Sequence, residues 1–197
     1  MVINLETAVE FLKTRDNFLI LTHSHPDGDT LGSAFALKYA LEALGKSANV
    51  RCNDTVAKKF DYLGRVCEDE CAFDALVAVD VADTKLLGKD FEEKFADRIE
   101  LCIDHHGSNR MFAERTLLDA NAAAACEIVL EVIHALGIKP TKQIADCIYT
   151  GISTDTGCFR YSNVTPRTMR MAAEMIECGA DNVTINTVMF ETKTRTY

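Results

Sequence analysis

The chain has 197 residues, of which 48% are hydrophobic and 26% charged, and its formal charge is −9 at pH 7. This is the composition of a globular protein with room for one domain, and no apolar run approaches the roughly 18 residues that a transmembrane helix needs. The N-terminus lacks the basic and apolar segments of a secretory signal, so we expect a cytoplasmic protein without membrane contact. The acidic balance argues against a broad surface for long nucleic acids, although metal ions could supply positive charge toward a phosphorylated ligand.

Apolar periodicity predicts strands and helices that alternate along the chain. The predicted elements are a helix at 5–14, a strand at 17–23, a helix from Asp29 or Thr30 to Leu44, a strand within 46–52, strands at 75–81 and 98–104, helices at 91–97, 122–136, 142–153 and 166–178, and a short helix within 181–197. The runs at 75–81 and 98–104 are continuously apolar, which is typical of strands buried on both faces. The pattern indicates an α/β fold with a doubly wound, mostly parallel β-sheet flanked by helices.

Eight cysteines are present, and several lie within apolar segments. Without an export signal they are interpreted as reduced, buried side chains rather than as disulfides. Cys67 and Cys71 are four residues apart, but no second pair of ligands at zinc-finger spacing accompanies them. A structural zinc site is therefore not expected.

Polar, ionisable residues follow several of the predicted strands. His23, Asp27 and Asp29 follow the first strand, and Asp155 follows a helix; the others are Asp80, Asp83, Asp104, His105 and His106, which follow the third and fourth strands. Ligands of a doubly wound sheet bind outside the carboxyl ends of its strands, so these residues are expected to converge on one edge.

Each cluster also has a purely structural explanation. Asp27 and Asp29 could cap a helix, Asp83 could cap the short TKLL segment, and Asp155 could belong to a turn before Gly157. Those explanations do not account for the gathering of so many carboxylates and imidazoles at one edge. Divalent cations such as Mn²⁺ do, because they take both kinds of ligand, and two ions roughly 3.5 to 4 Å apart form a clamp for phosphoryl transfer.

Local spacing refines this hypothesis. Gly28 is expected to let the chain bend sharply, so that Asp27 and Asp29 could serve different ions. Alternation along a strand predicts that His105 and His106 point to opposite sides, one toward metal and the other toward substrate. The absence of thiols near the cluster disfavours zinc.

Four ordered segments carry a resemblance to a known family: HSHPDGDTLGS, VAVDVADT, CIDHHGSN and GISTDTGCFRYSN. They resemble the four motifs of the DHH-family phosphoesterases, and they span residues 23–163. The PDGD, FRYSN and TPRT segments are similar to the nanoRNase branch, whose members are bifunctional oligoribonucleases and 3′-phosphoadenosine 5′-phosphate (pAp) phosphatases.

The resemblance implies roles for individual residues. The implied ligands of one Mn²⁺ are His23, Asp27 and Asp80, and those of the other are Asp29, Asp80, His105 and Asp155, with Asp80 as the bridge. His106 and Asp80 would be the catalytic residues, with His106 contacting the scissile phosphate, while Asp104 and Asp83 would support the ligands. Further candidates for substrate contact are Asn109, Arg160, Ser162 and Asn163. His25 has no implied role.

The resemblance further implies a Mn²⁺-dependent phosphoesterase, with Mg²⁺ or Co²⁺ as substitutes, acting on short RNA, linear dinucleotides or pAp. Residues 1–197 would form the catalytic DHH domain, without the glycine-rich substrate-binding domain that follows it in such enzymes, because no two of the ten glycines are adjacent. A manganese-dependent inorganic pyrophosphatase and a non-catalytic nucleotide-binding regulatory module remain alternatives. A homodimer is a candidate assembly.

Overall fold

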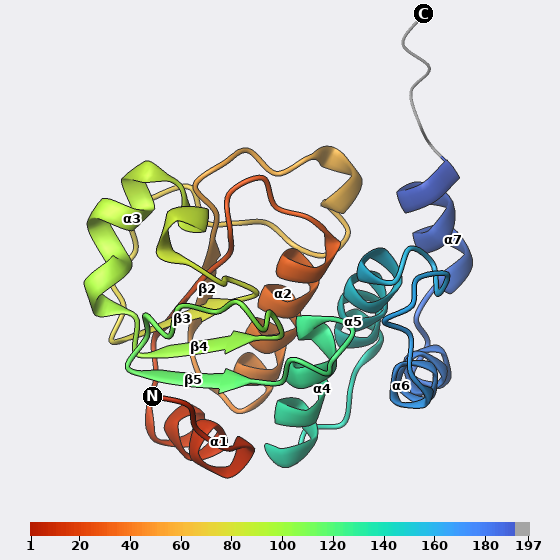
Figure 1. The fold of residues 1–197 in the computed structure, drawn as a ribbon, viewed down its shortest axis with the longest axis horizontal. Helices are drawn as coiled ribbons and strands as arrows, with labels where there is room; N and C mark the ends of the chain where they lie inside the picture. The colour runs from red at the N-terminus through yellow and green to blue at the C-terminus, as the bar shows by residue number, and fades with distance from the viewer. Residues whose placement is uncertain (192–197) are drawn as a thin grey trace, which may run out of the picture.

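The computed structural model describes residues 1–191 and contains one five-stranded sheet in which every pairing is parallel (Figure 1). The strand order is β2-β1-β3-β4-β5. The strands are β1 (Phe18–Leu21), β2 (Ala48–Arg51), β3 (Ala75–Val79), β4 (Leu101–Asp104) and β5 (Arg115–Leu118). Every residue of β1, β3 and β4 is buried, as the continuous apolar runs predict for central strands of a parallel sheet.

Helices cover both faces of the sheet, which confirms the doubly wound α/β fold. The helices are α1 (Leu5–Thr14), α2 (Gly28–Ala43), α3 (Lys89–Phe95), α4 (Ala125–Ala135), α5 (Lys142–Asp155), α6 (Pro166–Glu177) and α7 (Asn182–Asn186). The larger core lies between one sheet face and α1, α2 and α4, with α5 packed on α2 and α4. A smaller core joins the opposite face to α3 (Figure 1).

Shorter helical turns complete the fold. Three are 3-10 helices, η1 (Lys58–Phe60), η2 (Thr84–Leu87) and η3 (Ala96–Arg98), and a π-helical turn covers Thr187–Glu191. No helix within residues 1–191 is long and apolar enough to cross a membrane. The part of the expected C-terminal segment from residue 192 onward lies outside the described residues.

The chain leaves β1 toward β2 on one side and returns to β3 on the other. Parallel sheets bind ligands at such a point, because the connections from the two neighbouring strands diverge there and leave a crevice above the strand ends. The polar segments after β1 and β3 both leave the sheet at this point.

Several sequence-based boundaries need correction. β5 was not predicted, because this edge strand has only four residues, of which two are buried. β1 ends at Leu21 rather than at residue 23, and β3 ends at Val79 rather than at residue 81. In contrast, α5 runs on to Asp155, which therefore ends a helix instead of following one.

Glycines allow α2 to pack closely on α5 at the edge where the polar residues gather. A Cβ atom on Gly28 would lie 2.4 Å from the Thr154 hydroxyl oxygen, and one on Gly32 would lie 2.4 Å from the Cys147 carbonyl oxygen. Gly28 is the first residue of α2 and does not form the sharp bend that was expected. Its lack of a side chain instead brings the first turn of α2 against the last turn of α5.

Candidate metal centre

The six predicted metal ligands come together at the carboxyl edge of the sheet. The β1–α2 connection supplies His23 and Asp27, and the first turn of α2 supplies Asp29. Asp80 follows β3, His105 follows β4, and Asp155 ends α5. Asp80 has a left-handed backbone with φ 57°, which is uncommon for a residue other than glycine. Such backbone strain is found preferentially at functional sites, where the surrounding structure maintains it.

Asp80 lies between two groups of ligands. Its Oδ2 atom is 3.6 Å from His23 Nε2, and its Oδ1 atom is 3.5 Å from His105 Nε2. On the first side, His23 Nε2 also lies 3.7 Å from an Asp27 carboxylate oxygen. The two oxygens of one nearly buried carboxylate therefore face different histidines.

The second group surrounds His105. Its Nε2 atom lies 3.8 Å from Asp29 and 3.4 Å from Asp155, in addition to its approach to Asp80. Asp29 is fully buried, whereas the Asp155 side chain is partly exposed. Access from solvent is therefore on the Asp155 side of this group.

The polar atoms of the cluster are close but do not satisfy one another. The distances of 3.4–3.8 Å exceed hydrogen-bond length, and Asp80 Oδ1 and His105 Nε2 are buried without a partner. Two ligands about 2.1 Å from one divalent ion are about 3 Å apart when they meet at a right angle, so separations of this order suit a shared cation. The donor set of carboxylates and imidazoles matches Mn²⁺ better than a thiol-preferring metal.

Backbone carbonyls orient the two ligand histidines. His23 Nδ1 lies 2.7 Å from the Ser24 carbonyl oxygen, and His105 Nδ1 lies 3.2 Å from that of Ala122. A ring that donates from Nδ1 presents the lone pair of Nε2, and Nε2 is the atom that faces the carboxylates in both residues. This arrangement fixes imidazoles in metal sites generally.

The carboxylates repel one another strongly without a cation. Burial raises the pKa of Asp80 to about 7, with further contributions from Asp27 and Asp155. Burial and the neighbouring Asp80 charge likewise raise the pKa of Asp29 to about 7. The pKa of Asp155 reaches about 8 through burial and the charges of Asp29 and Asp27. Bound divalent ions would relieve this repulsion, and protons compete with them for the same oxygens.

The pKa of His23 is also raised, which favours the charged form of this side chain. Burial lowers its pKa, but the carboxylates of Asp27 and Asp80 outweigh burial and raise the pKa to about 11. A metal ion must therefore displace a tightly held proton from this imidazole, since only neutral histidine binds metal.

Asp27 and Asp29 also serve as helix caps, so the structural explanation and the metal hypothesis both apply to them. One Asp27 oxygen accepts from the amides of Asp29 and Thr30, at 3.0 Å and 3.1 Å, and so caps α2. Asp29 reaches across to α4, where its two oxygens accept from the amides of Ala125 and Cys126, at 2.6 Å and 3.0 Å. The second cap could not be predicted from spacing, because 96 residues separate its partners.

Asp104 holds the neighbouring His106 ring. Its Oδ1 atom lies 2.7 Å from His106 Nδ1, and its Oδ2 atom accepts from Asn109 Nδ2 at 2.7 Å. The hydrogen bond and charge of Asp104 outweigh burial and raise the pKa of His106 to about 9. Burial acts to raise the pKa of Asp104, but hydrogen bonds from His106 and Asn109 hold it below its ordinary value. Without metal ions the raised pKa favours the cationic form of His106 at neutral pH, with Nε2 as its remaining nitrogen.

The expected divergence of the two histidines is wrong. The rings of His105 and His106 lie with centroids 4.4 Å apart, and a nitrogen of each is 3.5 Å from Asp80 Oδ1. β4 ends at Asp104, so the alternation of side chains along a strand no longer applies to the next two residues.

Asp83 lies in a different setting from the other predicted acids. Its carboxylate accepts from the Lys85 amide at 3.1 Å and thereby caps η2, and it lies 3.6 Å from Arg110 Nε. Among the described residues these contacts do not connect it to the metal ligands. Capping of η2 accounts for Asp83. Among residues 1–191, neither of these contacts of Asp83 reaches a metal ligand, so its expected role in holding the ligands has no structural basis.

The candidate substrate residues fall into two groups. Asn109 is buried and uses its amide on Asp104 and the Val81 carbonyl, and the Asn163 amide donates to the carbonyls of Ala123 and Asp155. Both positions suit residues that hold the site in shape. Arg160 and Ser162 are exposed on the segment after α5, and Arg160 Nε donates to the Gly157 carbonyl.

Arg167, in the TPRT segment, contacts three acidic residues that its local sequence does not indicate. Its guanidinium lies 2.5 Å from Asp119, 3.3 Å from Glu127 and 3.1 Å from Glu131. Glu127 is fully buried in the first turn of α4, close in sequence to the amides that Asp29 caps. Arg167 therefore joins α6 to the same end of α4, a contact that only tertiary structure reveals.

The part of the chain that carries most of these site residues matches a known protein family. The family described as "DHH family, N-terminal domain" matches residues 17–152. The chain belongs to the DHH family. The Asp104-His105-His106 segment gives this DHH-family protein its signature triplet.

Curated relatives of this DHH-family chain include bifunctional oligoribonuclease and PAP phosphatase NrnA from Thermus thermophilus and from Bacillus subtilis. The first is 38% identical over 166 residues, covering 81% of this chain and 49% of the relative. The second is 25% identical over 183 residues, covering 90% of this chain and 58% of the relative. The chain thus spans about half the length of the curated relatives it matches.

Solved structures show the same DHH-family fold. An exopolyphosphatase-related protein from Bacteroides fragilis superposes with a TM-score of 0.88 at 22% identity, over 97% of this chain and 61% of that one. A putative family II inorganic pyrophosphatase from Methanococcus jannaschii gives a TM-score of 0.62 at 21% identity, over 88% of this chain and 59% of that one. These similarities concern the fold.

Proposed function

We propose that this chain is the catalytic domain of a phosphoesterase that uses two Mn²⁺ ions to hydrolyse short oligoribonucleotides, linear dinucleotides and pAp. The observation that carries the proposal is the position of Asp80, whose two carboxylate oxygens face the two separate ligand groups. The substrate class comes from the NrnA relatives, whose names describe an oligoribonuclease and PAP phosphatase.

The proposed ligand sets follow the two groups. His23 and Asp27 would hold one ion, and Asp29, His105 and Asp155 the other, with Asp80 shared between them. Two such ions, when bound, act as Lewis acids toward phosphoryl oxygens and lower the pKa of bound water. Their positive charge would also offset part of the formal −9 of the chain.

His106 is proposed to meet the reacting phosphate. Asp104 engages Nδ1 and keeps the ring protonated at neutral pH, which leaves the Nε2 proton for a phosphoryl oxygen. A positioned cationic donor stabilises the charge that accumulates on those oxygens in the transition state. Asp104 and Asn109 would act through His106 as positioning residues.

The test measures phosphate or mononucleotide release from pAp, a dinucleotide and pyrophosphate by the purified chain, with Mn²⁺ and with a chelator. We expect Mn²⁺-dependent release from the two nucleotides, whereas preferential hydrolysis of pyrophosphate would favour the pyrophosphatase alternative. Mn²⁺ binding followed by electron paramagnetic resonance separates a third case. A chain that neither binds Mn²⁺ nor hydrolyses a nucleotide would be a non-catalytic module.

Matched histidine variants test the catalytic assignment. His106→Ala should lower kcat by about 10²- to 10³-fold, the usual cost of losing one transition-state donor. His134→Ala is the control, because His134 is an exposed residue of α4 that pairs with Glu174. Equal activities of the two variants would refute the role of His106.

A further inference from the structure

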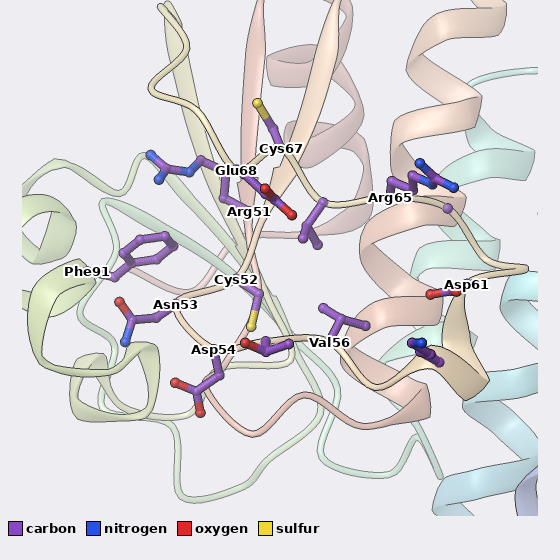
Figure 2. A pocket seen from close by; sticks show the side chains of 14 residues that line it. Arg51, Cys52, Asn53, Asp54, Val56, Asp61, Arg65, Cys67, Glu68 and Phe91 are labelled. Atoms are coloured by element: carbon purple, nitrogen blue, oxygen red, sulfur yellow. The ribbon is translucent and has the colours of Figure 1, made fainter.

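A cavity lies at the carboxyl end of β2. Its volume is about 550 Å³, within the range of small-molecule sites, and residues after β2 form one wall (Figure 2). Phe91 and Arg51 lie at one end, and Arg65 lies at the other, near α2 (Figure 2). None of the residues assigned above to metal or phosphate binding lines this cavity.

Direct contacts join the cavity wall to the loop that carries the metal ligands. The Cys52 thiol donates to the carbonyl oxygen of His23 at 3.4 Å. The Asp54 carboxylate accepts from the backbone amide of His25 at 2.9 Å and lies 3.0 Å from His25 Nδ1. His25, which the family resemblance left without a role, thus links the cavity wall to the β1–α2 loop. The cavity wall therefore contacts the loop that carries His23 and Asp27.

Three cationic side chains line the cavity, together with three acidic ones, Asp54, Asp61 and Glu68. Arg51, Lys58 and Arg65 line it, and none of the three forms an ion pair with another residue in 1–191. The Arg51 guanidinium lies 5.0 Å from the centre of the Phe91 ring, and its Nε atom is buried without a hydrogen-bond partner. These three cations are therefore available to the phosphate of a ligand in the cavity.

The rest of the lining indicates more than a bare anion. Asn53, Asp61 and Glu68 supply acceptors that could bind ribose hydroxyls or exocyclic amines, while Asp54 is already engaged by His25. The planar guanidinium of Arg51 offers a surface on which a base can stack. Phosphate, sugar and base together define a nucleotide.

We propose that this cavity is a nucleotide subsite that binds the non-scissile phosphate of a substrate with two phosphate groups, while the other phosphate lies at the metal cluster. The proposal rests on the proposed function and adds a selectivity determinant to it. Lys58 and Arg65 would bind the second phosphate, and Arg51 would support the adjoining base or sugar. A ligand that carries only the scissile phosphate would gain nothing from the subsite.

The test compares pAp with adenosine 3′-phosphate and adenosine 5′-phosphate, each of which lacks one of the two phosphates. Binding is measured by equilibrium dialysis with Mn²⁺ in a His106→Ala background, in which turnover is slowed. Lys58→Ala/Arg65→Ala should weaken pAp binding at least about tenfold, since each charge-assisted contact is worth about that factor. Binding of the monophosphate that keeps only the scissile phosphate should change by less than about threefold.

The charge-matched control is Lys139→Ala/Arg170→Ala, which removes two exposed cations outside the cavity and should leave pAp binding unchanged. Unchanged pAp binding in Lys58→Ala/Arg65→Ala, or an equal loss for pAp and the monophosphates, would overturn the subsite. Failure of the original chain to bind pAp would overturn it as well. Selective loss of pAp binding, with no hydrolysis by the original chain in Mn²⁺, would support the subsite and refute the phosphoesterase proposal.

Discussion

Asp29→Asn tests how much the fully buried Asp29 carboxylate stabilises the fold by capping α4. The two oxygens of Asp29 accept from the first amides of α4, at 2.6 Å and 3.0 Å. An asparagine keeps one acceptor oxygen and presents its NH₂ group to the other amide. One buried N–H is left without an acceptor, which costs about 2 kcal/mol. For a chain of this size the melting temperature should fall by about 4 to 8 °C.

The effect should depend on pH, in a direction that the pKa of Asp29 fixes. This pKa is raised from 3.8 to about 7, so the folded state binds more protons than the unfolded state between those values. The stabilising free energy of the carboxyl group is therefore lost as pH rises from 3.8 to about 7, where only the unfolded state ionises, and it changes little above about 7. Asparagine does not ionise, so the deficit of the variant should be larger near about pH 5.5 than near about pH 8.5 in metal-free buffer.

Asp27→Asn is the matched control. A single Asp27 oxygen accepts both α2 amides, and asparagine caps helices as well as aspartate does. The remaining loss is the pairing with His23, worth at most about 1 kcal/mol at a half-exposed site. Differential scanning fluorimetry at the two pH values measures both variants. Equal melting temperatures of the two variants near about pH 5.5 would refute the capping argument.

Three further predictions concern the surroundings of the site. Asp104→Asn should lower the pKa of His106 from about 9 toward its ordinary 6.5, because a neutral amide replaces the carboxylate partner; an imidazole NMR titration that does not move would contradict this. Arg167→Ala should lower the free energy of unfolding by about 3 kcal/mol in urea, because it leaves the charge of the fully buried Glu127 without a partner. Adding Glu127→Gln to this variant should restore much of that free energy. Gly151→Ala should destabilise the fold by about 1–3 kcal/mol despite the preference of helices for alanine, because the new methyl group would lie 2.2 Å from the buried Cys126 sulfur. A rise in melting temperature would show instead that the neighbouring helices can move apart.

Strong local signals explain how much of the fold the sequence predicts. The apolar runs of β3 and β4 and the periodic pattern of α5 are long enough to be recognised without tertiary context. β5 is too short and too exposed to give such a signal, and its pairing with β4 comes from tertiary position. The ends of the strands were also misplaced, because the apolar pattern continues into the loops.

The sequence named the members of the candidate site but not how they face one another. The ordered motifs and the expected convergence at strand ends selected His23, Asp80 and His105. They did not indicate that each Asp80 oxygen faces a different histidine, because that arrangement depends on a left-handed backbone and on the register of neighbouring strands. Nor did they indicate the direction in which His106 points, since the strand ends before it.

By itself, the sequence determined the fold class and the residues of the candidate metal centre, because hydrophobic period and motif spacing are local properties of the chain. Tertiary structure decided which carboxylate caps which helix, where unpaired cations line a cavity, and why Gly28 is small. Those features depend on atoms that are distant in sequence, such as Asp29 and the α4 amides, or His25 and Asp54. Only the packing of α2 against α4 and α5, over a sheet whose strand order reverses beside β1, brings them into contact.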